Sequence, residues 1–120
     1  MDERFLAVTE KELQSAVLEF MRWRGWMCYH TFDSRRSAAG FPDLVAVRGS
    51  RLLFVEFKKE KEKAKPKQVK WLDALVEAHD EVYLVRPSSQ DDFLENLEAS
   101  GSNLACHWRN VRERGKDVVA

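Results

Sequence analysis

Two acidic residues and a lysine lie at the ends of two short apolar runs, in a spacing that could support metal-dependent chemistry. The runs are rich in Val, Leu and Phe and flank Gly49-Ser50. Apolar runs joined by two residues that begin with Gly predict a β-hairpin with a type II′ turn. With this turn, Asp43 is opposite Glu56, and Lys58 lies on the same face two residues further along.

This arrangement suits a bound divalent cation. Directly opposed residues of a hairpin have Cβ atoms about 4.5–5.5 Å apart, so Asp43 and Glu56 can share one Mg²⁺, which prefers oxygen ligands. A bound metal lowers the pKa of its water and neutralises phosphate charge. Lys58, roughly 6.6 Å from Glu56 along the strand, would orient the water or stabilise the developing charge.

The residues around Glu56 are not those of an ordinary exposed hairpin. Val55 and Phe57 alternate with Glu56 and Lys58, and the run is apolar on both faces, which is typical of a central strand. Charged residues inside such a strand cost free energy unless they are paired or used. One ion pair between Glu56 and Lys58 would satisfy the charges of both residues, but it would not explain why an acid is present at position 43.

The order of these residues resembles the PD-(D/E)xK nuclease motif. The longer string Ser37-Ala38-Ala39-Gly40-Phe41-Pro42-Asp43-Leu44, then Glu56-Phe57-Lys58, then Gln68, resembles the VRR-NUC branch of that superfamily, over about residues 9–87. In size and motif order the chain is also similar to small archaeal-type Holliday junction resolving enzymes. The resemblance implies a restriction-endonuclease-like core, a Mg²⁺ cofactor that Mn²⁺ can replace, and a metal ligand from the Phe57 carbonyl.

A further acid is expected from the first helix. Thr9 and Glu12 form a capping box that opens a helix running to about Trp23. Glu10 lies at the edge of its apolar stripe, and Glu10-x-x-Leu13-Gln14 resembles the VRR-NUC start, in which related nucleases often place an acid. We therefore expect Glu10 to hold a second metal or a water, with Gln14 as a weaker candidate. The alternative is that Glu10 only complements the helix dipole.

Gln68 is the last candidate for the site. Pro66 suits the first position of a second helix, in which Gln68, Trp71, Leu72 and Leu75 share one face. This places Gln68 toward the sheet near Lys58, where it could orient the attacking water or the lysine. The alternative is a helix-start Gln bonded to the backbone. The stretch before this helix, residues 59–65, is predicted to be a polar, flexible connector.

Charge is distributed unevenly, although the net charge is zero. Residues 58–70 hold seven Lys and two Glu, whereas residues 71–98 hold eight acids and one Arg. A basic run is commonly a solvated face, but beside the predicted site it suits DNA phosphates. The loop before Asp43 adds two arginines that can clamp phosphate and a serine that can donate to it. The predicted DNA-binding residues are Arg35, Arg36, Ser37, Lys59, Lys61, Lys65 and Lys67.

The predicted elements form an α/β domain with a mixed central sheet flanked by helices. Strands are expected at about residues 26–32 and 81–85 in addition to the hairpin, and a crossover helix makes the last strand parallel to its neighbour. A final helix runs from Ser88 or Ser89 to about Ala99. We expect a flexible leader at residues 1–8, one nuclease domain at 9–99 and a tail at 100–120 that packs on the body, meets a partner subunit or binds DNA.

Composition limits the class of protein. The chain has 120 residues, 44% of them hydrophobic, which suits one domain with a modest core. No apolar run is long enough to span a membrane, and residues 1–4 do not resemble a signal peptide. Cys28 and Cys106 lie far apart, so we expect free thiols in a reducing cytoplasm, in a cellular or phage-encoded protein.

The sequence therefore predicts a metal-dependent, structure-specific endonuclease of DNA recombination or repair, and most specifically a Holliday junction resolvase. Two symmetric cuts require a homodimer, for which Trp108, Val111 and the last helix offer an apolar surface. Three alternatives stay open: a flap- or nick-cutting nuclease or another repair or phage nuclease of the VRR-NUC group, a DNA-binding module without catalysis, and an interaction protein whose charges form internal salt bridges.

Overall fold

The computed structural model describes residues 2–31, 38–98 and 104–114. Its strands are β1 (Met27–His30), β2 (Leu44–Arg48), β3 (Arg51–Phe57) and β4 (Val82–Val85). Its α-helices are α1 (Glu3–Ala7), α2 (Glu10–Trp23), α3 (Pro66–Ala78), α4 (Gln90–Glu95) and α5 (Trp108–Arg114), and a short 3₁₀ helix, η1 (Pro87–Ser89), precedes α4.

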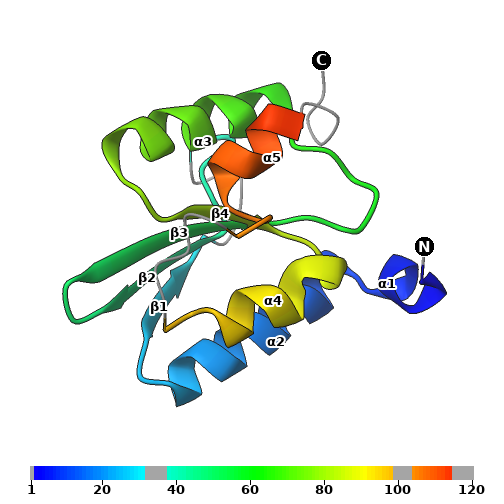
Figure 1. The fold of residues 1–120 in the computed structure, drawn as a ribbon, viewed down its shortest axis with the longest axis horizontal. Coiled ribbons are helices and arrows are strands. Elements are labelled where there is room, and N and C mark those ends of the chain that lie inside the picture. Colours follow the sequence, from blue (N-terminus) through cyan, green and yellow to red (C-terminus); the bar gives the residue numbers. More distant parts are fainter. Residues whose placement is uncertain (1, 32–37, 99–103, 115–120) are drawn as a thin grey trace.

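The four strands form one mixed sheet in the order β1-β2-β3-β4. The first three are antiparallel, and β4 is parallel to β3, as expected for a strand that follows a crossover helix. Helices α2 and α4 cover one face of the sheet, and α3 and α5 cover the other (Figure 1). The predicted mixed sheet between helices is confirmed.

The β2–β3 hairpin has the register that the sequence predicts. Leu44 pairs with Val55, and Arg48 pairs with Arg51 across the turn. Gly49 has a φ of +62°, and no residue other than glycine has a positive φ among those described. A positive φ at the first turn position only is the pattern of a type II′ turn. The two acids at the open end of the hairpin are therefore brought face to face.

The core has one cluster on each face of the sheet. The cluster under α2 and α4 contains Leu13, Val17, Met21, Leu53, Val55 and Phe57, and the cluster under α3 and α5 contains Leu72, Val76, Leu84, Trp108 and Val111. Of the apolar stripe that the sequence predicts for α2, Leu13, Val17 and Met21 are buried, Phe20 is partly buried and Ala16 is exposed, whereas Leu18 is buried as well. Thr9 caps α2, with the reciprocal bond from Glu12 that completes the capping box.

Three expectations outside the sheet are corrected. Within the expected flexible leader, residues 3–7 form α1, capped by the Asp2 side chain. The helix expected to reach about residue 99 is instead η1 followed by α4, which ends at Glu95.

The third correction concerns α5, whose apolar residues are not a surface for a partner. Trp108 is 0% exposed and Val111 is 1% exposed, because both pack into the protein's own core. The Trp108 indole N–H also donates to Asp73 Oδ1 at 2.7 Å. Of the three roles left open for the tail, residues 104–114 have the first, which is packing on the body.

The structure gives the state of the two cysteines and the character of the helices. Cys28 and Cys106 are free thiols, and burial raises the pKa of both, which makes them poor nucleophiles. Among the described residues, no helix combines the length and apolar character that crossing a membrane requires.

Candidate active site

The centre of the candidate site is a pair of acids, Asp43 just before β2 and Glu56 in β3. The Asp43 N–H donates to Glu56 Oε1 at 3.2 Å, and the Phe57 N–H donates to Asp43 Oδ2 at 2.9 Å. Each carboxylate therefore accepts a hydrogen bond from the backbone of the other strand. The structure brings together the two acids that the hairpin register predicts as neighbours.

Burial makes this pair costly when both members are ionised. Glu56 is 2% exposed, and burial, then the charge of Asp43, raises the pKa of Glu56 to about 9. Burial also raises the pKa of Asp43, although the hydrogen bond from Phe57 opposes the shift. A buried acid beside a second, half-buried acid favours either a retained proton or a nearby cation.

Lys58 is the cation that the chain itself supplies. It directly follows β3, and its backbone N–H donates to Val85 O at 3.1 Å, which continues the pairing with β4. Its side chain is 3% exposed, and Nζ lies 3.9 Å from Glu56 Oε2 and 4.0 Å from Glu62 Oε2. The predicted placement of Lys58 beside Glu56 is observed.

Glu10 reaches the same cluster from the first turn of α2. Burial raises its pKa to about 7, and a hydrogen bond with Glu62 and the charge of Asp43 act in the same direction. Its environment therefore contains more than the helix dipole, which was the alternative explanation for an acid at this position. Glu10, Asp43, Glu56 and Lys58 come from three separate elements and meet at one end of the sheet.

Glu62 belongs to this cluster and is not among the residues that the sequence singles out. The only sequence feature that links Glu62 to the site is its spacing of four residues from Lys58. Such a spacing brings two side chains together in a helix, but residues 60–61 form a turn. Its side chain is 46% exposed. Contact with both Glu10 and Lys58 places Glu62 at the mouth of the site.

The loop that carries Glu62 has fixed contacts, although it is predicted to be a flexible connector. Buried Arg86, directly after β4, donates from Nη2 to the Glu62 carbonyl at 2.7 Å. The Glu60 carboxylate accepts from the Ser88 N–H at 2.9 Å and from the Ser88 hydroxyl at 2.6 Å. Ala64 is fully buried. The end of β4 therefore positions this loop against the acids.

Gln68 lies in the first turn of α3, where it makes a local bond. Its Oε1 accepts from the Lys65 N–H at 2.8 Å, which is the helix-start bond given above as the alternative. With Gly40, Lys65 and Lys67 it lines a pocket of about 470 Å³. A role for Gln68 in orienting water or Lys58 stays a prediction.

Gly40 fixes the loop before Asp43 against the start of α3. Its φ is +91°, and a Cβ on it would lie 2.5 Å from the Lys67 carbonyl oxygen. This distance is shorter than the contacts that Cβ atoms make in proteins. The close approach and the positive φ both require glycine here. The contact sets the segment that leads into Asp43 beside Lys65 and Lys67.

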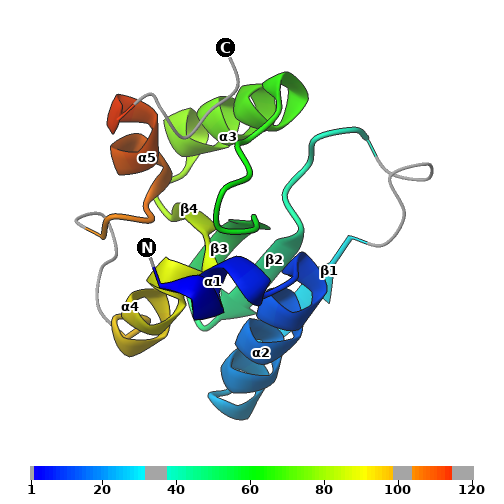
Figure 2. The same ribbon diagram turned by 90° about the vertical axis from the view of Figure 1, so that its right-hand side faces the viewer.

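The predicted DNA-binding residues fall into two groups. Those after β3 are exposed to solvent and lie in the anchored loop or at the start of α3: Lys59, Lys61, Lys65 and Lys67. The remaining three, Arg35, Arg36 and Ser37, lie outside the described residues. Figure 2 shows the loop after β3 and the start of α3 at the same end of the sheet as the start of α2.

The donor set suits a hard divalent cation. Within the described part of the chain, no three His, Cys, Asp or Glu side chains form a metal-binding group. Mg²⁺ commonly takes only one or two carboxylates and fills its octahedron with waters and substrate phosphates. Asp43 and Glu56, with the Phe57 carbonyl, fit that chemistry, and a cation between the acids would offset their mutual repulsion.

Comparisons with known proteins agree with this geometry. The family model of the VRR-NUC domain matches residues 3–89, a span that contains Glu10, Asp43, Glu56 and Lys58. A solved VRR-NUC domain structure is similar, with 26% sequence identity and a TM-score of 0.62, over 74% of this chain and 97% of that chain. No curated protein matches. Since the family model covers more than half of the chain, this protein belongs to the VRR-NUC family of nuclease domains.

Proposed function

We propose that this protein is a metal-dependent, structure-specific DNA endonuclease that resolves four-way junctions. Its family implies a nuclease. The observation that carries the metal-dependent part of the proposal is half-buried Asp43 hydrogen-bonded to buried Glu56, which lies beside buried Lys58. A DNA-binding module has no need of a buried acid beside a second acid, and an interaction protein with internal salt bridges would match each acid with its own cation. Here one lysine faces both Glu56 and Glu62.

The residues divide the reaction among them. Asp43, Glu56 and the Phe57 carbonyl would hold Mg²⁺ or Mn²⁺. When bound, the metal supplies a water of lowered pKa and a Lewis acid for the phosphate. Lys58 lies beside Glu56 and stabilises negative charge that develops on the phosphate. Glu10, whose pKa burial raises to about 7, would hold the attacking water or a second metal.

Structure-specific cutting follows from contacts to phosphates. The exposed lysines of the loop after β3 and the start of α3 lie beside the acids, and phosphate contacts carry no base sequence information. Binding should therefore depend on DNA shape and decrease steeply as salt rises.

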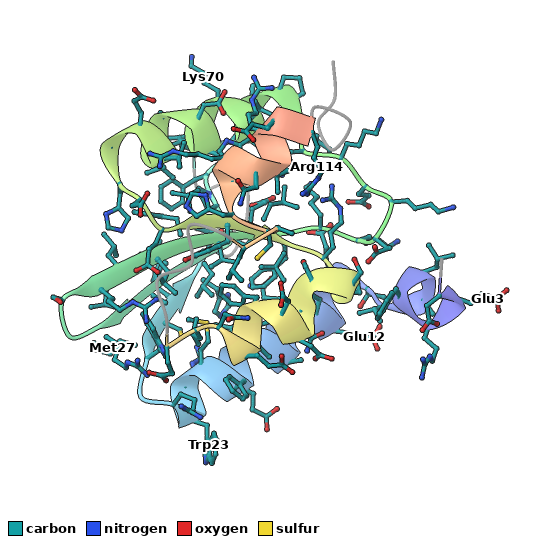
Figure 3. The ribbon with its side chains drawn as sticks, in the orientation of Figure 1. Glu3, Glu12, Trp23, Met27, Lys70 and Arg114 are labelled. Atoms are coloured by element: carbon teal, nitrogen blue, oxygen red, sulfur yellow. The ribbon has the colours of Figure 1, made fainter. Side chains whose placement is uncertain are left out.

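Junction resolution also requires two active sites, which we propose to come from a homodimer. Because α5 is occupied by the protein's own core, the dimer surface must lie elsewhere. Met27 is 77% exposed, Tyr29 61% and Val47 40%. Met27 pairs with Val47, so these side chains form an apolar patch on the β1–β2 side of the sheet, and Figure 3 shows Met27 projecting away from the body.

The test is a pair of measurements on the purified protein. Light scattering gives its molar mass, and cleavage of a synthetic four-way junction is compared with linear duplex, flap and nicked DNA in Mg²⁺. We expect a dimer that prefers the junction and an inactive Glu56→Gln control. A monomer that prefers flaps or nicks would support the nuclease activity but contradict the proposed junction resolution. Full activity in excess EDTA would contradict the metal dependence.

A further inference from the structure

A groove of about 610 Å³ runs between α2 and the end of β1, next to the candidate site. Lys11, Ser15 and Arg22 contribute to its α2 wall, and His30 and Thr31 contribute to the other. We propose that this groove binds the phosphate backbone of the DNA strand that flanks the cleaved bond. The inference rests on the proposed nuclease function and adds a binding surface distinct from the lysines after β3.

The α2 wall has the spacing of a continuous stripe. Lys11, Ser15, Leu18 and Arg22 recur every three or four residues, which places them on one face of a helix. The eleven steps along the helix from Lys11 to Arg22 span roughly 16 Å at 1.5 Å per residue. That length corresponds to about five nucleotides at 3.4 Å per nucleotide of one strand. The stripe is therefore long enough to hold two phosphates several nucleotides apart.

The two cations of the stripe are available for such contacts. Neither Lys11 nor Arg22 forms an ion pair with any residue in the described ranges 2–31, 38–98 and 104–114. By contrast, Arg24 at the end of α2 is paired with Glu98 at 2.9 Å. Glu19 is the acidic residue of the groove lining, so the lysine and arginine outnumber it.

The groove joins the catalytic centre directly. Lys11 follows Glu10 in the chain, and the Thr31 N–H donates to the Asp43 carbonyl at 2.9 Å. The Thr31 hydroxyl also donates to the Pro42 carbonyl at 3.4 Å. A strand with its phosphate at the acids would therefore enter the groove at Lys11 and leave it near Arg22.

The groove and the basic run approach the acids from opposite sides. Helices α2 and α3 lie on opposite faces of the sheet (Figure 2), and Lys65 and Lys67 are at the start of α3. DNA that crosses the end of the sheet would meet lysines on one side of the cleaved bond and the groove on the other. This is the geometry that contacts to both flanks of a scissile phosphate require.

The first test measures DNA affinity against salt for a junction, in a Glu56→Gln background so that no cutting occurs. The pair Lys11→Gln and Arg22→Gln should weaken binding on the order of tenfold and lower the slope of log K against log salt by about 2, since each lost phosphate contact removes about 0.9. The matched control is Arg109→Gln with Arg112→Gln on α5, which removes the same charge from exposed ion pairs. Equal losses in both pairs would overturn the inference.

The second test locates the flank. With the active protein, substrates are trimmed to two nucleotides on one side of the cleavage point and then on the other. One trimming should weaken wild-type binding and leave the Lys11→Gln/Arg22→Gln protein unchanged, because the groove contact is already lost. If trimming weakens binding of the Lys11→Gln/Arg22→Gln protein as much as it weakens wild-type binding, the trimmed flank lies outside the groove.

The outcomes separate the two proposals. Protein that cuts DNA, and binds equally well with and without Lys11 and Arg22, contradicts the groove alone. Groove-dependent binding without any cutting in Mg²⁺ supports the groove and contradicts the nuclease activity. A protein that does not bind DNA contradicts both.

Discussion

Asp43 donates its backbone N–H to the Glu56 carboxylate at 3.2 Å, although the two residues are thirteen positions apart in the chain. The reciprocal bond, from the Phe57 N–H to Asp43 Oδ2 at 2.9 Å, locks both acids at the open end of the hairpin. Their positions are therefore fixed by backbone geometry before any ligand arrives. A preorganised pair of ligands of this kind is what a catalytic site needs.

Removal of either acid should separate cleavage from binding. Asp43→Asn or Glu56→Gln should lose cleavage by several orders of magnitude in Mg²⁺, because a metal ligand is lost, while DNA affinity holds or rises as anionic repulsion decreases. Single-turnover cleavage and equilibrium binding in Ca²⁺ measure the two effects. Glu95→Gln, an exposed acid on α4, is the charge-matched control. Normal cutting by Lys58→Ala would contradict the assigned site.

Stability of the metal-free protein should decrease as pH rises. An unfolded Glu56 ionises near its ordinary pKa of 4.5, whereas the folded carboxyl keeps its proton up to about pH 9. The folded state thus binds more protons between these values, and each pH unit there removes up to about 1.4 kcal/mol from the free energy of unfolding. The raised pKa values of Glu10 and Asp43 act in the same direction.

Urea unfolding in EDTA at pH 5.5, 7 and 8.5 measures this dependence. Glu56→Gln, which mimics the protonated carboxyl, should flatten the curve, and Mg²⁺ should stabilise the wild type more at pH 8.5 than at pH 5.5, because the metal displaces protons. Wild type and Glu56→Gln with the same pH dependence would contradict the raised pKa of Glu56.

Gly40 should tolerate alanine less well than Gly49. Gly40→Ala combines the positive φ of +91° with a contact of 2.5 Å to the Lys67 carbonyl oxygen, so it should destabilise by more than about 2 kcal/mol. Gly49→Ala, with a φ of +62° and no atom within 4 Å, should cost only about 1–2 kcal/mol. The difference between the two in urea unfolding isolates the close contact, and equal costs would contradict it.

Trp108 should matter to folding and not to assembly. Trp108→Ala should cost about 3–5 kcal/mol through the cavity it leaves, and Trp108→Phe about 1–2 kcal/mol, because the hydrogen bond to Asp73 is lost. Trp23→Ala, which removes a side chain that is 78% exposed, should change stability by less than about 0.5 kcal/mol. A stable Trp108→Ala protein with altered molar mass would restore the partner surface first expected there.

Gln68 offers a test of catalysis against capping. Gln68→Glu retains an oxygen that can accept from the Lys65 N–H, whereas Gln68→Ala removes it and should cost about 1 kcal/mol of stability. If Gln68 orients the attacking water or Lys58, both variants should cut slowly at saturating DNA and metal. If Gln68→Glu cuts at the wild-type rate, Gln68 has no role in catalysis, and its function is the helix-start bond to the Lys65 N–H.

Local rules determined the part of the site that lies on the hairpin. The positive φ of Gly49 sets the turn, the turn sets the register, and the register alone places Asp43 opposite Glu56. The start of α2 is equally local, because Thr9 and Glu12 cap each other within one turn. Such features depend on neighbours in the chain and can be predicted without the rest of the protein.

Contacts between distant segments decided the remainder. An apolar stripe such as that of α5 fits the protein's own core and a second copy equally well, and only the space left beside α3 and β4 made Trp108 and Val111 internal. Glu62 reaches Glu10 and Lys58 because Arg86, twenty-four residues later, holds its loop from the end of β4. No local spacing encodes that contact, since it exists only when the parallel pairing of β3 and β4 has brought the two segments together.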